Sequence, residues 1–122
     1  MSKMKFKNKR EIGRWGEQKA KSFLKDKGYN IISENFRVKQ GEIDLIVKKK
    51  NMLVFVEVKT RKTKFFGPPQ AAVNFAKKNK IRTIAKIFLM RNNYKNYKKR
   101  FDVISIIYGN EKINIEHYKN TF

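Results

Sequence analysis

The sequence of 122 residues has no cysteine, one histidine, two prolines and only ten acidic residues. Without cysteine, disulfides, zinc fingers and thiol catalysis are excluded. The one histidine, His117, alternates with Ile113 and Ile115, so we expect it to be structural or solvated and not an acid–base catalyst. No apolar run approaches the roughly 18 residues of a membrane span, and no apolar stretch of a signal peptide follows the basic start. We therefore expect a cytoplasmic protein with no membrane association.

Basic residues dominate the charge. The chain has 31 Lys and Arg against 10 Asp and Glu, a net charge of +21, and such a field attracts polyanions whatever the fold. Nucleic acid is the expected partner, with DNA favoured over RNA, although charge alone does not distinguish the two. Apolar residues make up 40% of the chain, enough for a folded core, and the length suits one domain.

The first half of the chain predicts a basic arm and a helix. Residues 1–9 form the basic arm, and residues 10–122 form a single domain. A helix is expected over 10–27, because five apolar residues fall on one stripe and Gly28 follows as a stop: Ile12, Trp15, Ala20, Phe23 and Leu24. Gly13 and Gly16 each cost about 1 kcal/mol inside a helix, which either a close backbone approach or a frayed first turn would explain.

The rest of the chain predicts strands around a second helix. Extended segments are expected at 29–33, 36–38, 42–48, 52–59, 101–108 and 112–118, and a helix from Pro68-Pro69 to near Asn92. The segments 42–48 and 52–59 form a hairpin, as do the last two.

The hairpin over 42–59 is apolar on both sides. The register that matches Ile46 with Leu53 places Ile46, Leu53 and Phe55 on one face. It places Ile43, Leu45 and Val47 on the other face, with Val54, Val56 and Val58. The predicted fold class is therefore α/β, with a mixed central sheet of about five strands, a helix on each face, and the order α-β-β-β-α-β-β.

Three of the ten acids, Glu42, Asp44 and Glu57, lie in this central hairpin. A buried acid in a strand needs a partner or a purpose. The predicted register puts Asp44 and Glu57 on one face, and Lys59 joins them. Two carboxylates about 5 Å apart repel by roughly 3 kcal/mol at an effective dielectric of about 20, which an ammonium or a hard divalent ion such as Mg²⁺ or Mn²⁺ would reverse.

Structural explanations stand beside the chemical one. Asp44, Glu57 and Lys59 would also fit ordinary cross-strand ion pairs. Glu42 borders the Gln40-Gly41 turn and is expected to be solvated, while Glu17 is either a surface helix acid or completes the acidic cluster. We expect Asp102, behind Arg100, to pair with a neighbouring cation.

The segments GEIDLI at 41–46 and FVEVKTR at 55–61 carry a family resemblance. Together with the glycines and Glu17 of the first helix and RFDVI at 100–104, they resemble the YraN family of small bacterial proteins. That family is similar to the restriction-endonuclease-like PD-(D/E)-x-K superfamily, and to archaeal Holliday junction resolvases in particular. Ile43 stands where the superfamily's name has proline.

The resemblance implies roles for the acids and the lysine. Asp44 and Glu57 would bind Mg²⁺ or Mn²⁺ with the main-chain carbonyl of Val58, Lys59 would orient or deprotonate the attacking water, and Glu17 would be the helix-borne acid. The implied chemistry is phosphodiester hydrolysis by in-line attack. Resolvase-like relatives work as dimers, which leaves a homodimer open.

Basic and aromatic residues surround the predicted site. Arg37, Arg61, Lys62 and Lys64 flank it, and Phe65 and Phe66 either stack on bases or cover the core edge. Gln70 matches a polar position of some relatives. Lys77, with Lys78, Lys80 and Arg82, forms either a ridge that contacts the nucleic-acid backbone or the solvated face of the second helix.

Two functions follow. The first is a metal-dependent nuclease acting on DNA, including branched or junction DNA. The second is a non-catalytic module that binds DNA, or RNA in association with the ribosome, on a nuclease scaffold. Because Glu17, Asp44, Glu57 and Lys59 are all present, the first is favoured.

Overall fold

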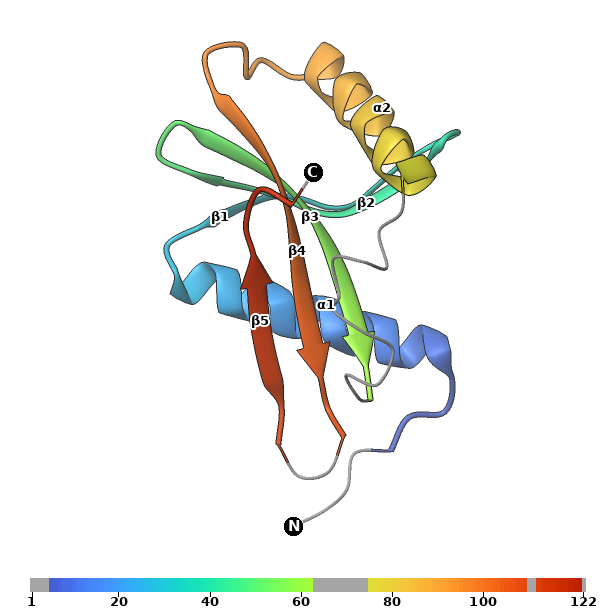
Figure 1. Cartoon of the computed structure of the whole chain (residues 1–122). Helices are drawn as coiled ribbons and strands as arrows, with labels where there is room; N and C mark the ends of the chain where they lie inside the picture. The colour runs from blue at the N-terminus through green and yellow to red at the C-terminus, as the bar shows by residue number, and fades with distance from the viewer. Residues whose placement is uncertain (1–4, 63–74, 110–111, 122) are drawn as a thin grey trace.

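The computed structural model describes residues 5–62, 75–109 and 112–121. The elements follow the predicted order: α1 (Lys9–Asp26), β1 (Asn30–Val38), β2 (Gly41–Lys49), β3 (Met52–Arg61), α2 (Phe75–Arg91), β4 (Lys98–Ile107) and β5 (Asn114–Tyr118). The strands form one sheet in the order β1-β2-β3-β4-β5, in which β3 and β4 are parallel and the other neighbours antiparallel (Figure 1). The expected α/β fold with a mixed five-stranded sheet is confirmed.

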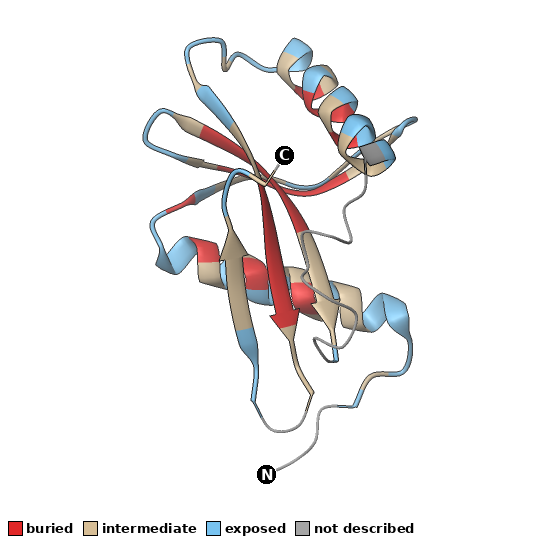
Figure 2. Ribbon diagram, viewed as in Figure 1, coloured by how far each residue is buried: buried red, intermediate tan, exposed pale blue. Residues whose placement is uncertain are grey.

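The sheet separates two apolar clusters, one under each helix. On the α2 side, Ile81, Ile84, Ala85 and Phe88 pack on Ile43, Ile46, Leu53, Phe55 and Val103. On the α1 side, Ala20 and Leu24 pack on Tyr29, Leu45, Val47, Val54, Val56, Ile104 and Ile106. The central strands β3 and β4 are buried over their middle parts, residues 53–57 and 102–106 (Figure 2). Burial on both faces explains why their sequences read as continuous apolar runs.

Helix α1 begins one residue earlier than predicted. A side-chain cap holds its N-terminus, and a close contact with β3 holds its middle. The Asn8 side chain accepts a hydrogen bond from the Glu11 backbone N–H at 2.9 Å, which caps the helix. Before the cap, Phe6 packs on the rings of Trp15 and Tyr108, so this residue of the expected basic arm lies against the domain. A Cβ at Gly16 would overlap the Thr60 side chain, whereas one at Gly13 would meet nothing within 4 Å. The predicted close approach is therefore confirmed at Gly16 alone.

The register of the central hairpin differs from the prediction. Ile46 pairs with Phe55, and not with Leu53. The reason is the turn: Lys49 pairs with Met52, which leaves two residues in the loop where three were expected, and Lys50 takes a φ of 55°. Continued by one residue, the new register places Asp44 opposite Glu57.

Strand β2 also loses its alternation at Asp44. Ile43 packs in the α2-side cluster and Leu45 in the α1-side cluster, so the prediction that they share a face was wrong. The physical reason is that β2 pairs with β3 only from Leu45 onward. Residues 41–43 of β2 pair with β1 alone, so β3 does not fix which way their side chains point. Strand β1 runs unbroken from Asn30 to Val38, with a register shift near Ile31 and a φ of 50° at Asn35, where two extended segments were expected.

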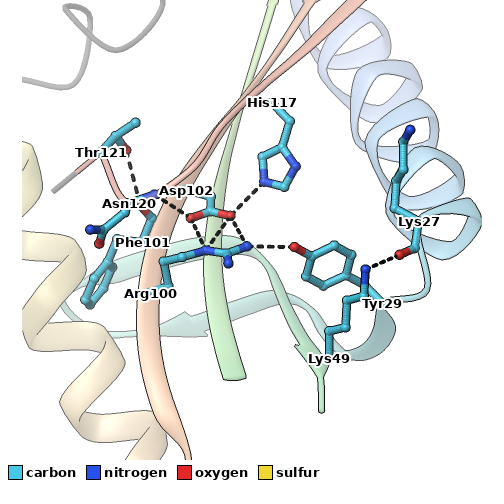
Figure 3. Close-up of polar contacts among 9 residues, drawn as sticks. All are labelled: Lys27, Tyr29, Lys49, Arg100, Phe101, Asp102, His117, Asn120 and Thr121. Carbon is cyan, nitrogen blue, oxygen red and sulfur yellow. Dashed lines mark hydrogen bonds and ion pairs between the residues drawn. The ribbon is translucent and has the colours of Figure 1, made fainter. Parts of the chain in front are cut away.

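A closed polar network joins β4, β5 and the start of β1 (Figure 3). Asp102, fully buried, accepts hydrogen bonds from Arg100 Nε at 2.9 Å, Arg100 Nη2 at 2.8 Å and the Asn120 backbone N–H at 2.9 Å, and His117 Nε2 lies 2.7 Å from it. Arg100 also donates to the Tyr29 hydroxyl at 2.7 Å. The expected cation partner of Asp102 is therefore confirmed, as is a structural place for His117.

Helix α2 ends at Arg91, close to the predicted Asn92. The predicted start at Pro68-Pro69 lies outside the described residues. Neither described helix combines the length and apolar character needed to cross a membrane.

Candidate active site at the open edge of strand β3

The site lies where β2 leaves β3. Beyond Val56 no described strand pairs with the β2-facing edge of β3, while the other edge stays paired with β4 as far as Arg61. Asp44 fills the first gap, because its Oδ2 accepts a hydrogen bond of 2.8 Å from the Val58 backbone N–H. The N–H and C=O of one strand residue point to the same side, so the Val58 carbonyl faces the same opening.

Asp44 and Glu57 meet at this opening as a pair of carboxyl groups. Burial, a hydrogen bond to Glu57 and the Glu57 charge raise the pKa of Asp44 from 3.8 to about 9. Burial also pushes the pKa of Glu57 up, but the hydrogen bonds from Asp44 and Lys77 outweigh it and leave that pKa below its ordinary value. At neutral pH the pair of carboxyl groups therefore holds one proton between them.

Two lysines complete the centre of the site. Lys77 Nζ, from α2, lies 2.9 Å from Glu57 Oε2. Lys59 extends from β3 two residues after Glu57, on the same face. Burial and the neighbouring Lys77 ammonium lower the pKa of Lys59. A lysine whose pKa is lowered exchanges its proton more readily near neutral pH, which suits a group that handles the proton of a water molecule.

Glu17 reaches the same opening from α1. Its Oε1 accepts a hydrogen bond of 2.9 Å from the Asn35 side chain. Burial raises the pKa of Glu17, with further contributions from Glu42, Glu57 and Glu34. The packing of Gly16 on Thr60 brings this part of α1 to the sheet. The structure thus brings together the four residues predicted to be catalytic.

These groups line a pocket of about 690 Å³. Its walls come from the first half of α1, the end of β3, α2 and the end of β4: Lys9, Ile12, Gly13, Glu17, Asp44, Glu57, Val58, Lys59, Thr60, Arg61, Lys62, Lys77 and Tyr108. A local acidic centre is therefore enclosed by cationic side chains.

The donor set fits a hard divalent ion. Asp44, Glu57 and the Val58 carbonyl offer oxygen ligands only, as Mg²⁺ and Mn²⁺ prefer. Within the described ranges no three His, Cys, Asp or Glu side chains lie close enough together to hold a metal. Proteins usually bind Mg²⁺ through one or two carboxylates, and water and substrate oxygens complete its coordination. Glu17 is therefore not needed as a direct metal ligand.

The predicted nucleic-acid contacts are distributed unevenly. Arg61, Lys62 and Lys77 line the pocket. Arg37 does not: it pairs with Glu42 at 3.0 Å on the β1–β2 hairpin, and its side chain is 76% exposed. Lys64, Gln70, Phe65 and Phe66 lie outside the described residues.

Sequence reasoning missed two contacts of the site. It placed Lys77 either on a ridge that contacts the nucleic-acid backbone or on the solvated face of the helix, because nothing in the spacing of α2 indicates how close that helix comes to Glu57. It also gave no role to Asn35, whose left-handed backbone in β1 aims its amide at Glu17. An asparagine inside a strand, a residue that tolerates positive φ, was the available signal.

Comparison with known proteins places the chain. Residues 16–106 match the model of the uncharacterised protein family UPF0102. A UPF0102 protein of Caldanaerobacter subterraneus subsp. tengcongensis is 46% identical over 122 residues, covering 98% of this chain and 100% of the relative. A UPF0102 protein of Caldicellulosiruptor saccharolyticus is 45% identical over 117 residues, and one of Clostridium botulinum strain 657 is 43% identical over 116 residues. These matches cover 94% and 93% of this chain and 99% and 94% of the two relatives. The chain therefore belongs to the UPF0102 family, which is the YraN family of the sequence resemblance.

Proposed function

We propose that the protein is a metal-dependent nuclease that hydrolyses phosphodiester bonds in DNA and works in the cytoplasm. The observation that carries the proposal is the Asp44–Glu57 carboxyl pair, set beside Lys59 and Lys77 in a pocket of a chain with a net charge of +21. The proposal includes membership of the restriction-endonuclease-like superfamily, and branched or junction DNA is the substrate we would try first.

The residues divide the work. Asp44, Glu57 and the Val58 carbonyl would hold Mg²⁺ or Mn²⁺, which would activate water and neutralise charge that develops on the phosphate. Lys59 would orient the attacking water or, with its Nζ unprotonated, accept the proton that the water loses. Lys77 keeps Glu57 ionised and stays within reach of a phosphate oxygen.

Binding comes from the cationic surround. Arg61, Lys62 and Lys77 contact phosphates near the cut, and Arg37 binds nucleic acid farther from the pocket. Lys64 and Gln70, which lie outside the described residues, stay predicted contacts from the sequence. Glu17 supports the acidic centre from α1. Two copies of the chain would present two such sites to two strands, which is the arrangement a junction substrate requires.

Cleavage assays on the purified chain test the proposal. The substrates are duplex, flap, four-way-junction and single-stranded DNA, each with Mg²⁺, Mn²⁺ or EDTA. Asp44→Asn should lower the rate at least about 100-fold. Asp26→Asn, the same change at an exposed position at the end of α1, should leave the rate unchanged.

Two results would contradict the proposal. Cleavage that persists in EDTA or in Asp44→Asn would come from another site or from contamination. Binding without cleavage by the wild-type chain would identify a non-catalytic module.

A further inference from the structure

Two side chains of the described part of the chain have buried polar atoms without a hydrogen-bond partner. They are Arg61, at Nε and Nη2, and Ser105, at Oγ. Buried polar groups are almost always paired, because an unpaired one loses its hydration without compensation. Where such an orphan lines a pocket, it is a sign that a partner from outside the fold completes the site.

Both orphans are neighbours of Lys59 on one face of the sheet. Alternation along β3 places Glu57, Lys59 and Arg61 on the same face. Ser105 pairs directly with Lys59 in the parallel β3–β4 ladder, so its hydroxyl shares that face. The unpaired donors therefore adjoin the proposed catalytic lysine and lie nowhere else among the described residues.

The fold does not supply their acceptor from the acids at hand. Glu57 is engaged by Asp44 and Lys77. Glu116, which pairs with Ser105 in the β4–β5 ladder, accepts hydrogen bonds from the Tyr118 hydroxyl at 2.6 Å and from Asn114 at 3.3 Å. Arg61 also lines the pocket of about 690 Å³, so an anion that enters the pocket comes close to this residue.

We propose that Arg61 is a preformed subsite for the phosphate next to the one that is cut. Ser105 is fully buried and does not line the pocket, so it is not part of this subsite. The inference rests on the proposed nuclease function and specifies its substrate: a nucleic-acid strand with at least two consecutive phosphates on this side of the site. Lys59 and Arg61 are two residues apart, about 6.7 Å along a strand, which suits neighbouring phosphates of one backbone. The planar guanidinium can bind two phosphate oxygens at once, which a lysine cannot do.

The variant Arg61→Met separates this role from a structural one. Because Nε and Nη2 of Arg61 are buried without a hydrogen-bond partner in the free protein, Arg61→Met should leave its melting temperature unchanged or raise it, whereas loss of a structural arginine would lower it. Binding of a short DNA strand in EDTA should weaken at least about tenfold, and the slope of log affinity against log salt should fall by about one. Arg61→Lys, which keeps the charge but loses the fork, should fall between Arg61→Met and wild type.

Arg91→Met is the matched control, because Arg91 is exposed at the far end of α2 and its loss removes the same charge. It should change DNA affinity less than twofold. Inorganic phosphate should raise the melting temperature of wild type and Arg91→Met, but not of Arg61→Met.

The outcomes are distinguishable from those for the nuclease. If wild type cuts DNA but Arg61→Met and Arg91→Met bind alike, the subsite is wrong and the nuclease stands. If wild type does not cut but the loss of binding and of phosphate stabilisation is specific to Arg61→Met, the subsite stands without the nuclease. A melting temperature of Arg61→Met well below wild type overturns the subsite.

Discussion

The described part of the chain has two buried acidic centres, one at Asp44 on β2 and one at Asp102 on β4, on either side of β3, and they are built in opposite ways. Asp102 of β4 is saturated by Arg100, His117 and the Asn120 backbone. Asp44 of β2 receives one backbone hydrogen bond and otherwise faces another carboxyl group at a pocket. Burial acts on both, yet the pKa of Asp102 is lowered because hydrogen bonds from His117 and Arg100 outweigh it, while that of Asp44 is raised.

The difference separates structure from function. A buried acid whose partners come from the fold stabilises the fold. A buried pair of acids whose compensation is incomplete costs stability, and such strain is typical of a site that awaits a cation. Substitution should therefore destabilise the fold strongly at Asp102 and only slightly, or not at all, at Asp44.

The largest expected effect on the free energy of unfolding is at Asp102, whose hydrogen-bond partners all come from the fold. Asp102→Asn removes the counter-charge of Arg100, whose side chain is only 17% exposed, and should lower the free energy of unfolding by about 3–5 kcal/mol. Urea unfolding followed by circular dichroism measures it. Asp44→Asn mimics the protonated acid and should change stability by less than about 1 kcal/mol at pH 6. Equal losses in both variants would remove the distinction between the centres.

The pH dependence of stability should also distinguish the centres. Between its ordinary pKa of 3.8 and its folded pKa of about 9, Asp44 holds a proton that the unfolded chain has released. Stability should therefore fall as pH rises through this window, by at most about 1.4 kcal/mol per pH unit. Asp102, with its pKa lowered, contributes stability that is present at neutral pH and lost only as pH falls below about 3.8.

The measurement compares urea midpoints of wild type and Asp44→Asn from pH 5.5 to 8.5. The wild type should lose stability relative to the variant as pH rises, and Mn²⁺ should remove the difference in slope. Parallel curves would show that Asp44 ionises normally in the folded chain.

A smaller effect on stability is expected at Gly16, whose packing on Thr60 brings α1 to the sheet beside the pocket of Asp44 and Glu57. Gly16→Ala forces a methyl group into Thr60 and should cost about 1–3 kcal/mol. Gly13→Ala, one turn earlier in open space, should stabilise the helix by up to about 1 kcal/mol. Two losses of similar size would mean that the close approach of α1 does not depend on Gly16.

The sequence predicted the α/β order, both hairpins and the convergence of Asp44, Glu57 and Lys59, because apolar alternation and scarce acids in apolar strands are local signals. It failed on Ile43 and on the Ile46–Phe55 pairing, because a bend in β2 and a turn shorter by one residue are decided by pairing across strands. It also left Lys77 either on a ridge that contacts the nucleic-acid backbone or on the solvated face of the helix, and gave Asp102 only one partner. Lys77 is 20 positions from Glu57 and His117 is 15 positions from Asp102. Contacts over such separations depend on how the helix and the strands pack.

Calorimetric titration of the metal-free chain with Mn²⁺ at pH 7 tests the central claim most directly. The pair of Asp44 and Glu57 should bind one Mn²⁺ per chain and release about one proton, read from the dependence of the heat on buffer ionisation. Asp44→Asn should abolish both the binding and the proton release, while Asp26→Asn should bind as wild type does. No uptake by wild type, or uptake that Asp44→Asn leaves unchanged, would contradict the account.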